Sequence, residues 1–269
     1  MRAGPYILGL TGVLALVIGV QVSGAGAAAA AGTPTTVAGL GTRASGAGAD
    51  PATSSATSAR ALVTAAVAAA KAQKSVHFVE WASAGKQSIS VVGDVSPTTG
   101  QQTTTVRNGS SVGHVQGLYT GGKVYFRGDA YGLGSYLGMP TALARKYVDR
   151  WIAFSKSDAG FAQTAKQFTV AGPLAEIDLT GRLSRLTSTT VDATPVMAVS
   201  GRTNALSSKG RSGSGTLYVA ADGTRLPVRF TGTGREANRS STVRVDFSGW
   251  GEPVDVKVPP IAIPASKVS

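Results

Sequence analysis

The sequence predicts an α+β fold built on a strongly curved antiparallel sheet of about eleven strands with helices packed against it. Segments that alternate apolar and polar residues recur along most of the chain, and tight-turn pairs such as Asn108-Gly109 and Asp222-Gly223 join them. The alternation stops between residues 130 and 181. Glycine tolerates the positive φ of tight hairpins, and hairpins join antiparallel neighbours. We therefore predict an antiparallel meander interrupted by a helical insert.

The 269 residues include no cysteine, so disulfides, thiolate metal sites, a cysteine nucleophile and a lipid-anchoring cysteine are excluded. The net charge of +12 favours anionic partners. There is no run of basic residues and no recognisable nucleic-acid module, so we expect no nucleic-acid binding and instead an anionic membrane surface or envelope polymer. The basic residues are scattered singly, for example Arg107, Lys123, Arg127, Arg182, Arg202, Arg225 and Arg244.

Residues 1–31 have the pattern of a secretory signal peptide. Arg2 precedes an apolar stretch over residues 6–22, and small residues suited to a signal peptidase follow it. The alternative is an uncleaved membrane anchor. We expect a secreted or cell-envelope, extracytoplasmic protein, or one that is tethered to the membrane through an unprocessed leader.

Residues 32–57 are rich in Gly, Ala, Ser and Thr and predict a disordered linker. A folded domain is predicted over 58–260, followed by a C-terminal tail over 261–269. The domain begins with an alanine-rich helix, Ser58–Lys74, which has lysines in its last turn. Strands are then predicted at 76–83, 86–95, 101–107, 112–120 and 123–127.

The period changes in the insert, which we interpret as a helical roof across the sheet. Residues 131–140 predict a loop or short helix, and helices are predicted at 141–147, 161–168 and 174–179, with a short strand at 151–155. Strand patterns return at 183–191, 195–203, 214–221, 226–233, 242–248 and 254–258.

Several short stretches follow one another in a recognisable order: residues 74–78, 122–126, 146–152 with Trp151, 217–229 and 247–254. In this order they resemble the LppX/LprG group of actinobacterial envelope proteins, which share the half-barrel of the LolA/LolB carriers. The resemblance spans about residues 57–260. It implies helices on the concave face of a half-barrel, with a space between sheet and helices that accepts acyl chains. Lipoproteins of this family carry a cysteine after the leader, and this chain has none.

Catalytic patterns are weak. Residues 109–113 match G-x-S-x-G, but a nucleophile elbow needs a strand, a sharp turn and a helix, whereas here a hairpin turn is followed by a strand. Two histidines, His77 and His114, lack a neighbouring carboxylate cluster, and Glu176-x-Asp178 is interpreted as part of a solvated face. We therefore expect a protein that is not an enzyme, with no catalytic residue, no metal and no cofactor.

The apolar residues offer the better candidate site, because ligand sites are concave and mostly apolar. We predict a monomeric carrier or binding protein for an amphipathic lipid or lipid-like envelope component. The alternative is a non-catalytic structural or interaction module with a solid core and a basic surface. The candidates for lining the cavity are Phe78, Ile89, Val91, Val124, Phe126, Tyr136, Leu137, Trp151, Phe154, Val199, Leu217, Phe230 and Phe247.

Overall fold

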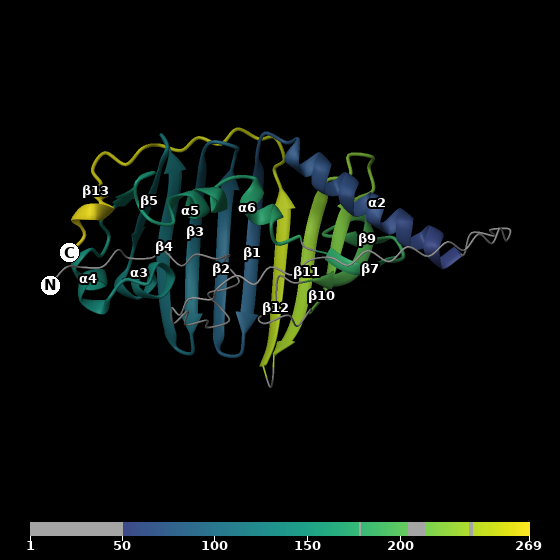
Figure 1. Cartoon of the computed structure of the whole chain (residues 1–269), viewed down its shortest axis with the longest axis horizontal. Helices are drawn as coiled ribbons and strands as arrows, with labels where there is room; N and C mark the ends of the chain where they lie inside the picture. Colours follow the sequence, from purple (N-terminus) through teal and green to yellow (C-terminus); the bar gives the residue numbers. More distant parts are fainter. Residues whose placement is uncertain (1–50, 178, 204–212, 237–238) are drawn as a thin grey trace, which may run out of the picture.

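The computed structural model describes residues 51–269 except 178, 204–212 and 237–238. The predicted leader and the first part of the predicted linker, 32–50, lie outside this part. Thirteen strands of the described chain form one curved sheet in the order β13-β6-β5-β4-β3-β2-β1-β12-β11-β10-β9-β7, with β8 paired to β9 (Figure 1). Their bounds are β1 Val76–Ala84, β2 Gln87–Val95, β3 Gly100–Asn108, β4 Ser111–Thr120, β5 Lys123–Gly128, β6 Ile152–Phe154, β7 Leu179–Arg185, β8 Thr189–Val191, β9 Thr194–Thr203, β10 Gly213–Ala220, β11 Pro227–Glu236, β12 Arg239–Ser248 and β13 Ile263–Pro264.

The predicted α+β class and antiparallel meander are confirmed. All pairings are antiparallel except the short parallel pair of β13 with β6. The pairing of β1 with β12 joins the first six strands to the later ones, with Glu80 opposite Val245. The strands at the two ends, β13 and β7, do not pair with each other, so the sheet is an unclosed half-barrel.

Two strand predictions were wrong in detail. The predicted strand at 183–191 is divided between β7 and β8. Residues 254–258 form no strand, because Gly249 and Gly251, at φ 56° and 82°, turn the chain away after β12. Figure 1 shows this yellow segment crossing one end of the sheet before it reaches β13. The predicted tail therefore contributes an edge strand.

One face of the sheet is buried. Along β1 the side chains of Phe78, Glu80 and Ala82 are buried, whereas Trp81, which points the other way, is 44% exposed. The strand register aligns the inward-facing residues of neighbouring strands, since Glu80 lies opposite Val91 and Val91 lies opposite Thr104. Period-2 alternation thus places one side of each of these strands on the same buried surface.

The helices lie against this buried face. Helix α2 (Pro51–Lys71) crosses the half that contains β7, β9 and β11. The short helices α3 (Ala130–Leu137), α4 (Thr141–Lys146), α5 (Phe161–Gln167) and α6 (Ala171–Leu174) belong to the other half, where α3 and α5 contact β3–β5 (Figure 1). The predicted packing of helices on the concave face is confirmed. We call the buried face of the sheet, together with the helix surfaces against it, the inner layer.

Local sequence explains how α3 reaches the sheet. Asp129 caps the helix, its carboxylate accepting a hydrogen bond of 2.7 Å from the Gly132 amide, and Gly138 ends it at φ 68°. A Cβ on Gly113 of β4 would lie only 2.4 Å from the Gly132 nitrogen. Glycine at both positions therefore lets the backbone of α3 approach the strand directly.

Helix bounds differ from the predictions at two places. Helix α2 starts at Pro51, before the predicted Ser58, and proline suits the first turn because its missing N–H has no helical partner there. The helix predicted at 174–179 instead spans Ala171–Leu174, and Pro173 occupies its first turn. The chain needs the residues after Leu174 to reach β7. In the described part of the chain, no helix has the length and apolar character that a membrane crossing requires.

Candidate ligand-binding site

The structure brings eleven of the thirteen candidate residues together in one buried apolar cluster of the inner layer. Phe154 is partly buried and packs against that cluster. Trp151 lies apart, because its ring stacks against the Arg127 guanidinium, 4.9 Å from the ring centre. The buried members are Phe78, Ile89, Val91, Val124, Phe126, Tyr136, Leu137, Val199, Leu217, Phe230 and Phe247.

Phe126 is the centre of an aromatic group beneath the short helices. Its ring meets those of Tyr136, Phe154 and Phe168 edge-on, with centroid distances of 6.1, 5.8 and 5.7 Å. Phe168 was not among the candidates, and its ring occupies the space above Gly117, where a Cβ would lie 2.4 Å from it. The helical spacing of Phe161, Ala165 and Phe168 could have identified it.

Polar side chains are also buried in this layer. Glu80 comes from β1, Gln102 and Thr104 from β3, Thr164 from α5, and Glu176 from the segment between α6 and β7. The interpretation of Glu176 as part of a solvated face was therefore wrong. Glu80 was not among the candidates, and its position in phase with Phe78 and Ala82 on the buried side of β1 could have identified it.

Burial changes the protonation of these groups. It raises the pKa of Glu80 well above its ordinary value of 4.5, and the nearby Glu176 carboxyl raises it further. Burial likewise raises the pKa of Glu176 to about 7. The pKa of Tyr136 rises to about 12, chiefly through burial, while a hydrogen bond with Thr104 opposes the rise and Glu80 adds to it. The two carboxyls thus favour their neutral, protonated forms.

Three atoms of the inner layer have no hydrogen-bond partner among the described residues. They are Glu80 Oε1, Gln102 Oε1 and Thr164 Oγ1, all fully buried. Gln102 uses its other end, since Nε2 donates a 2.7 Å hydrogen bond to the Gln167 carbonyl of α5. A buried polar atom without a partner costs about 1–3 kcal/mol, so folded proteins leave few of them.

A pocket of about 230 Å³ opens beside α3, at the first residues of β2 and the last residues of β3. Tyr131 and Ser135 of α3 border it, together with Ile89 and Val106 of the inner face. Its other lining residues are polar: Gln87, Ser88, Arg107 and Asn108. One candidate residue, Ile89, therefore lies at an opening between sheet and helices.

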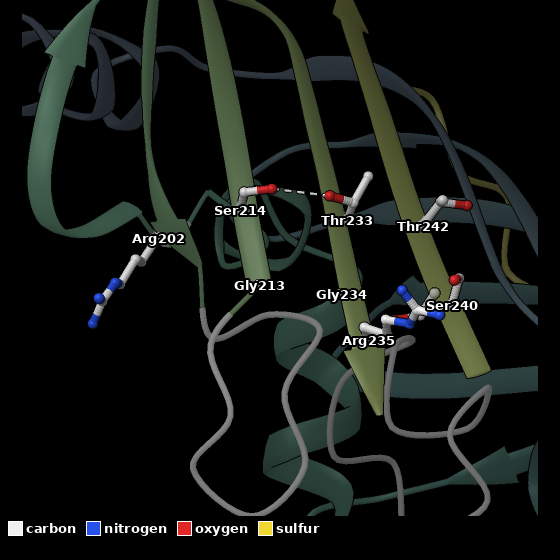
Figure 2. Close-up of a pocket in the computed structure, with 9 residues that line it drawn as sticks. Arg202, Gly213, Ser214, Thr233, Gly234, Arg235, Ser240 and Thr242 are labelled. Atoms are coloured by element: carbon white, nitrogen blue, oxygen red, sulfur yellow. Dashed lines mark hydrogen bonds between the residues drawn. The ribbon is translucent and has the colours of Figure 1, made fainter. Parts of the chain in front are cut away.

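A larger pocket of about 730 Å³ lies at one end of β9–β12 and is lined by arginine, serine, threonine and glycine residues (Figure 2). Arg202 and Arg235 line it with a row of hydroxyls, in which Ser214 and Thr233 are hydrogen-bonded at 2.9 Å. Its other lining residues are Gly213, Gly234, Ser240, Ser241 and Thr242. Figure 2 shows the Arg202 side chain pointing away from this row and the Arg235 side chain lying next to Ser240, so the two arginines stand at opposite sides of the pocket. Arginine and hydroxyl groups are both hydrogen-bond donors that suit anionic groups.

The sequence motifs considered for catalysis and metal binding lie in strands and a hairpin turn. Gly109 occupies the hairpin turn between β3 and β4, so the geometry of a nucleophile elbow is not present there. His77 Nδ1 lies 2.7 Å from Asp94 Oδ1, whereas His114 contacts Thr105 at 3.2 Å. In the described residues no group of three His, Cys, Asp or Glu side chains could hold a metal ion.

Together the sheet and its helices define an α+β half-barrel with an apolar inner layer that contains buried carboxyl and amide groups. No protein-family model and no curated protein sequence matches the chain. Among solved structures, it resembles the lipoprotein LppX of Mycobacterium tuberculosis with a TM-score of 0.49 and 17% identity, covering 75% of this chain and 99% of that one. It also resembles LprF of Mycobacterium bovis with a TM-score of 0.48 and 16% identity, covering 76% and 97%. The LppX/LprG group that the sequence resembles is thus represented among these structures.

Proposed function

We propose that this chain is an exported carrier or binding protein for an amphipathic lipid or lipid-like envelope component held in the inner layer. The proposal rests on two properties that occur together in the inner layer. The layer is lined by apolar side chains, yet Glu80, Gln102 and Thr164 each leave a buried polar atom without a protein partner. A molecule with an acyl chain and a polar end complements both.

Access would come from movement of the short helices. Residues 130–177 form a cover made of separate short pieces, and Gly138 and Gly160 adopt left-handed φ of 68° and 77° at its helix ends. The pocket beside α3 gives an opening between this cover and β2 and β3. The acyl chain would enter there as the cover moves away from the sheet.

Extraction of protein purified from its own host should release a co-purifying amphipathic compound that mass spectrometry detects. Val91→Phe should reduce the amount bound several-fold, because Val91 is buried in the inner layer opposite Glu80. Val92→Phe is the matched control, since Val92 follows it in β2 but points outward and is 43% exposed. Protein that is consistently empty, whichever variant is extracted, would refute the carrier function.

The second candidate is a structural or interaction module with a solid core and a basic surface. Close packing in the inner layer favours it, because the Phe168 ring covers Gly117 and the Phe78 ring covers Gly93. The polar pocket lined by Arg202 and Arg235 would then be the contact for an anionic surface or polymer.

The double change Arg202→Glu with Arg235→Glu tests this second candidate. Binding to anionic phospholipid vesicles should fall by about tenfold or more at low salt, since each basic residue near such a surface contributes roughly 1 kcal/mol. Arg145→Glu with Arg150→Glu changes the net charge equally at exposed positions outside that pocket and should have a smaller effect. Equal losses in a vesicle co-sedimentation assay would show that net charge, and not this pocket, governs binding.

A further inference from the structure

We propose that the segment from Gly249 to Ala262, which we call the strap, is a docking site for an anionic lipid bilayer. The strap joins β12 to β13 across one end of the sheet (Figure 1). Its exposed apolar side chains, Val258 and Ile261, insert between the lipids, and lysines around it contact the head groups. The proposal concerns the outside of the molecule, so it goes beyond the carrier function and does not depend on it.

The strap carries the two large apolar side chains that are most exposed in the described part of the chain. Val258 is 56% exposed and Ile261 is 81% exposed, and no other exceeds 44% there. Val254 and Val256 are half-buried and alternate with exposed residues, but the alternation breaks after them, where Val258 is exposed and Pro259 is buried. Exposed aliphatic side chains of this size gain free energy on transfer from water into an apolar phase.

The strap is tied to the rest of the fold near both of its ends. The Gly251 amide donates a 3.1 Å hydrogen bond to the Ser75 carbonyl. Beyond the other end, the Ile263 amide donates one of 2.8 Å to the Trp151 carbonyl. Between these ties, two successive prolines fix their own φ angles. The exposed apolar side chains are therefore presented by a restrained segment, and little chain entropy is lost when they enter a bilayer.

The shape of the strap favours a bilayer over a protein as its partner. Val258 and Ile261 are three residues apart, within about 11 Å of each other, and their neighbours Lys257 and Pro260 are also exposed. A stable protein interface buries about 800 Å² on each partner, far more than two such side chains provide. Binding to a bilayer surface instead scales with the apolar area inserted plus the attraction of basic residues to anionic lipids.

Basic residues surround the strap at its end of the sheet. The register defines this end, because Val95 at the end of β2 lies opposite Val76 and Gly100, and β12 ends beside them. The same register puts the β4–β5 turn and the segment after β6 there. The exposed lysines of the segments at this end are Lys71, Lys74, Lys123, Lys156 and Lys257. The exposed acids of the same segments are Glu252 and Asp255, so positive charge is in excess. Each basic residue close to an anionic bilayer strengthens binding several-fold.

Docking by the strap sets the orientation of the molecule. The pocket beside α3 includes Gln87 and Asn108, which lie at the far ends of β2 and β3 from Val95 and Gly100. A strand of 9 residues, such as β2, spans about 26 Å at roughly 3.3 Å per residue. The arginine-lined pocket at β9–β12 includes the start of β12, whereas the strap follows its end. A docked molecule therefore holds both pockets away from the bilayer.

Fluorescence of a dye attached beside the exposed apolar residues tests the proposal on the full chain. Because the chain has no cysteine, Lys257→Cys provides a unique site for a nitrobenzoxadiazole label, whose emission rises in apolar surroundings. With vesicles of phosphatidylglycerol and phosphatidylcholine in equal parts, the emission should rise by about threefold or more. Adding Ile261→Ser should raise the lipid concentration at half-maximal emission by about tenfold or more. With vesicles of phosphatidylcholine alone, binding should be several-fold weaker.

Two controls separate the strap from other contacts with lipid. Ser110→Cys, labelled in the same way, lies in the hairpin turn at the opposite end of β3 and should show no rise. Leu186→Ser removes an aliphatic side chain that is 43% exposed outside the strap, and it should leave the Lys257→Cys titration unchanged. The dye reports only its own surroundings, so lipid contact made by the predicted leader does not produce the signal.

No rise in emission at Lys257→Cys would overturn the proposal and indicate a protein as the partner of the strap. An equal rise at Ser110→Cys, or a titration that Ile261→Ser leaves unchanged, would also overturn it, because lipid would then contact the protein elsewhere. An equal response to phosphatidylcholine alone would overturn the choice of an anionic bilayer. The carrier function is tested separately by extraction, and none of these outcomes changes it.

Discussion

Phe126→Ala should lower the free energy of unfolding by about 3–5 kcal/mol, the usual cost of truncating a fully buried phenylalanine. Phe126 is 0% exposed and meets three aromatic rings edge-on, from α3, from β6 and from the end of α5. The ring therefore packs α3, β6 and the end of α5 against β5. Urea unfolding followed by circular dichroism measures the change.

Trp81→Ala provides the comparison for Phe126→Ala. Trp81 is the larger side chain and also lies in a long strand, but it points outward and is 44% exposed. Its truncation should therefore cost about 1 kcal/mol or less. If the two variants lost equal stability, the aromatic group around Phe126 would not be a principal part of the core, and the placement of the helices on the inner face would be in doubt.

Alternation of residue types predicted the sheet well because it depends only on local chemistry. In β1, Phe78 and Ala82 alternate with the outward Trp81, and the same pattern continues in β2 and β12. The turn pairs supplied the antiparallel connections. A local pattern does not predict the pairing of β1 with β12, which places Glu80 opposite Val245 in the middle of the sheet. The parallel contact of Ile263 with Ile152 also joins residues that are remote in sequence.

The candidate site was predicted unevenly for a related reason. Apolar candidates in a strand period, such as Phe78 and Val91, are buried in the inner layer, whereas Trp151, which the resemblance singled out, stacks on Arg127. Glu176 was interpreted as part of a solvated face because residues at i and i+2 diverge on a helix, and Glu80 was not among the candidates. Position outweighs residue type for Glu80, which occupies an inward position on a strand whose inner side is buried throughout. The burial of Glu176 depends on how the chain turns from α6 into β7, which no local pattern predicts.

The stability of the protein should fall as the pH rises from about 4.5 to about 7, and Glu176→Gln should remove the part of that fall that Glu176 contributes. The folded-state pKa of Glu176 is raised to about 7 from its ordinary value of 4.5, so the folded protein keeps a proton that the unfolded chain releases. The resulting stability is fully present below about pH 4.5 and is lost as the pH rises through about 7. The difference corresponds to roughly 3 kcal/mol.

Urea unfolding of the wild type and of Glu176→Gln at pH 5, 6, 7 and 8 measures this difference. The variant should equal the wild type or be slightly less stable at pH 5, and should be more stable by about 3 kcal/mol at pH 8, because glutamine carries no charge to bury. The variant also removes the like charge beside Glu80, which acts in the same direction. Glu252→Gln, at an exposed position, should leave the pH dependence unchanged. Parallel curves for the wild type and Glu176→Gln would mean that Glu176 is solvated in the folded protein.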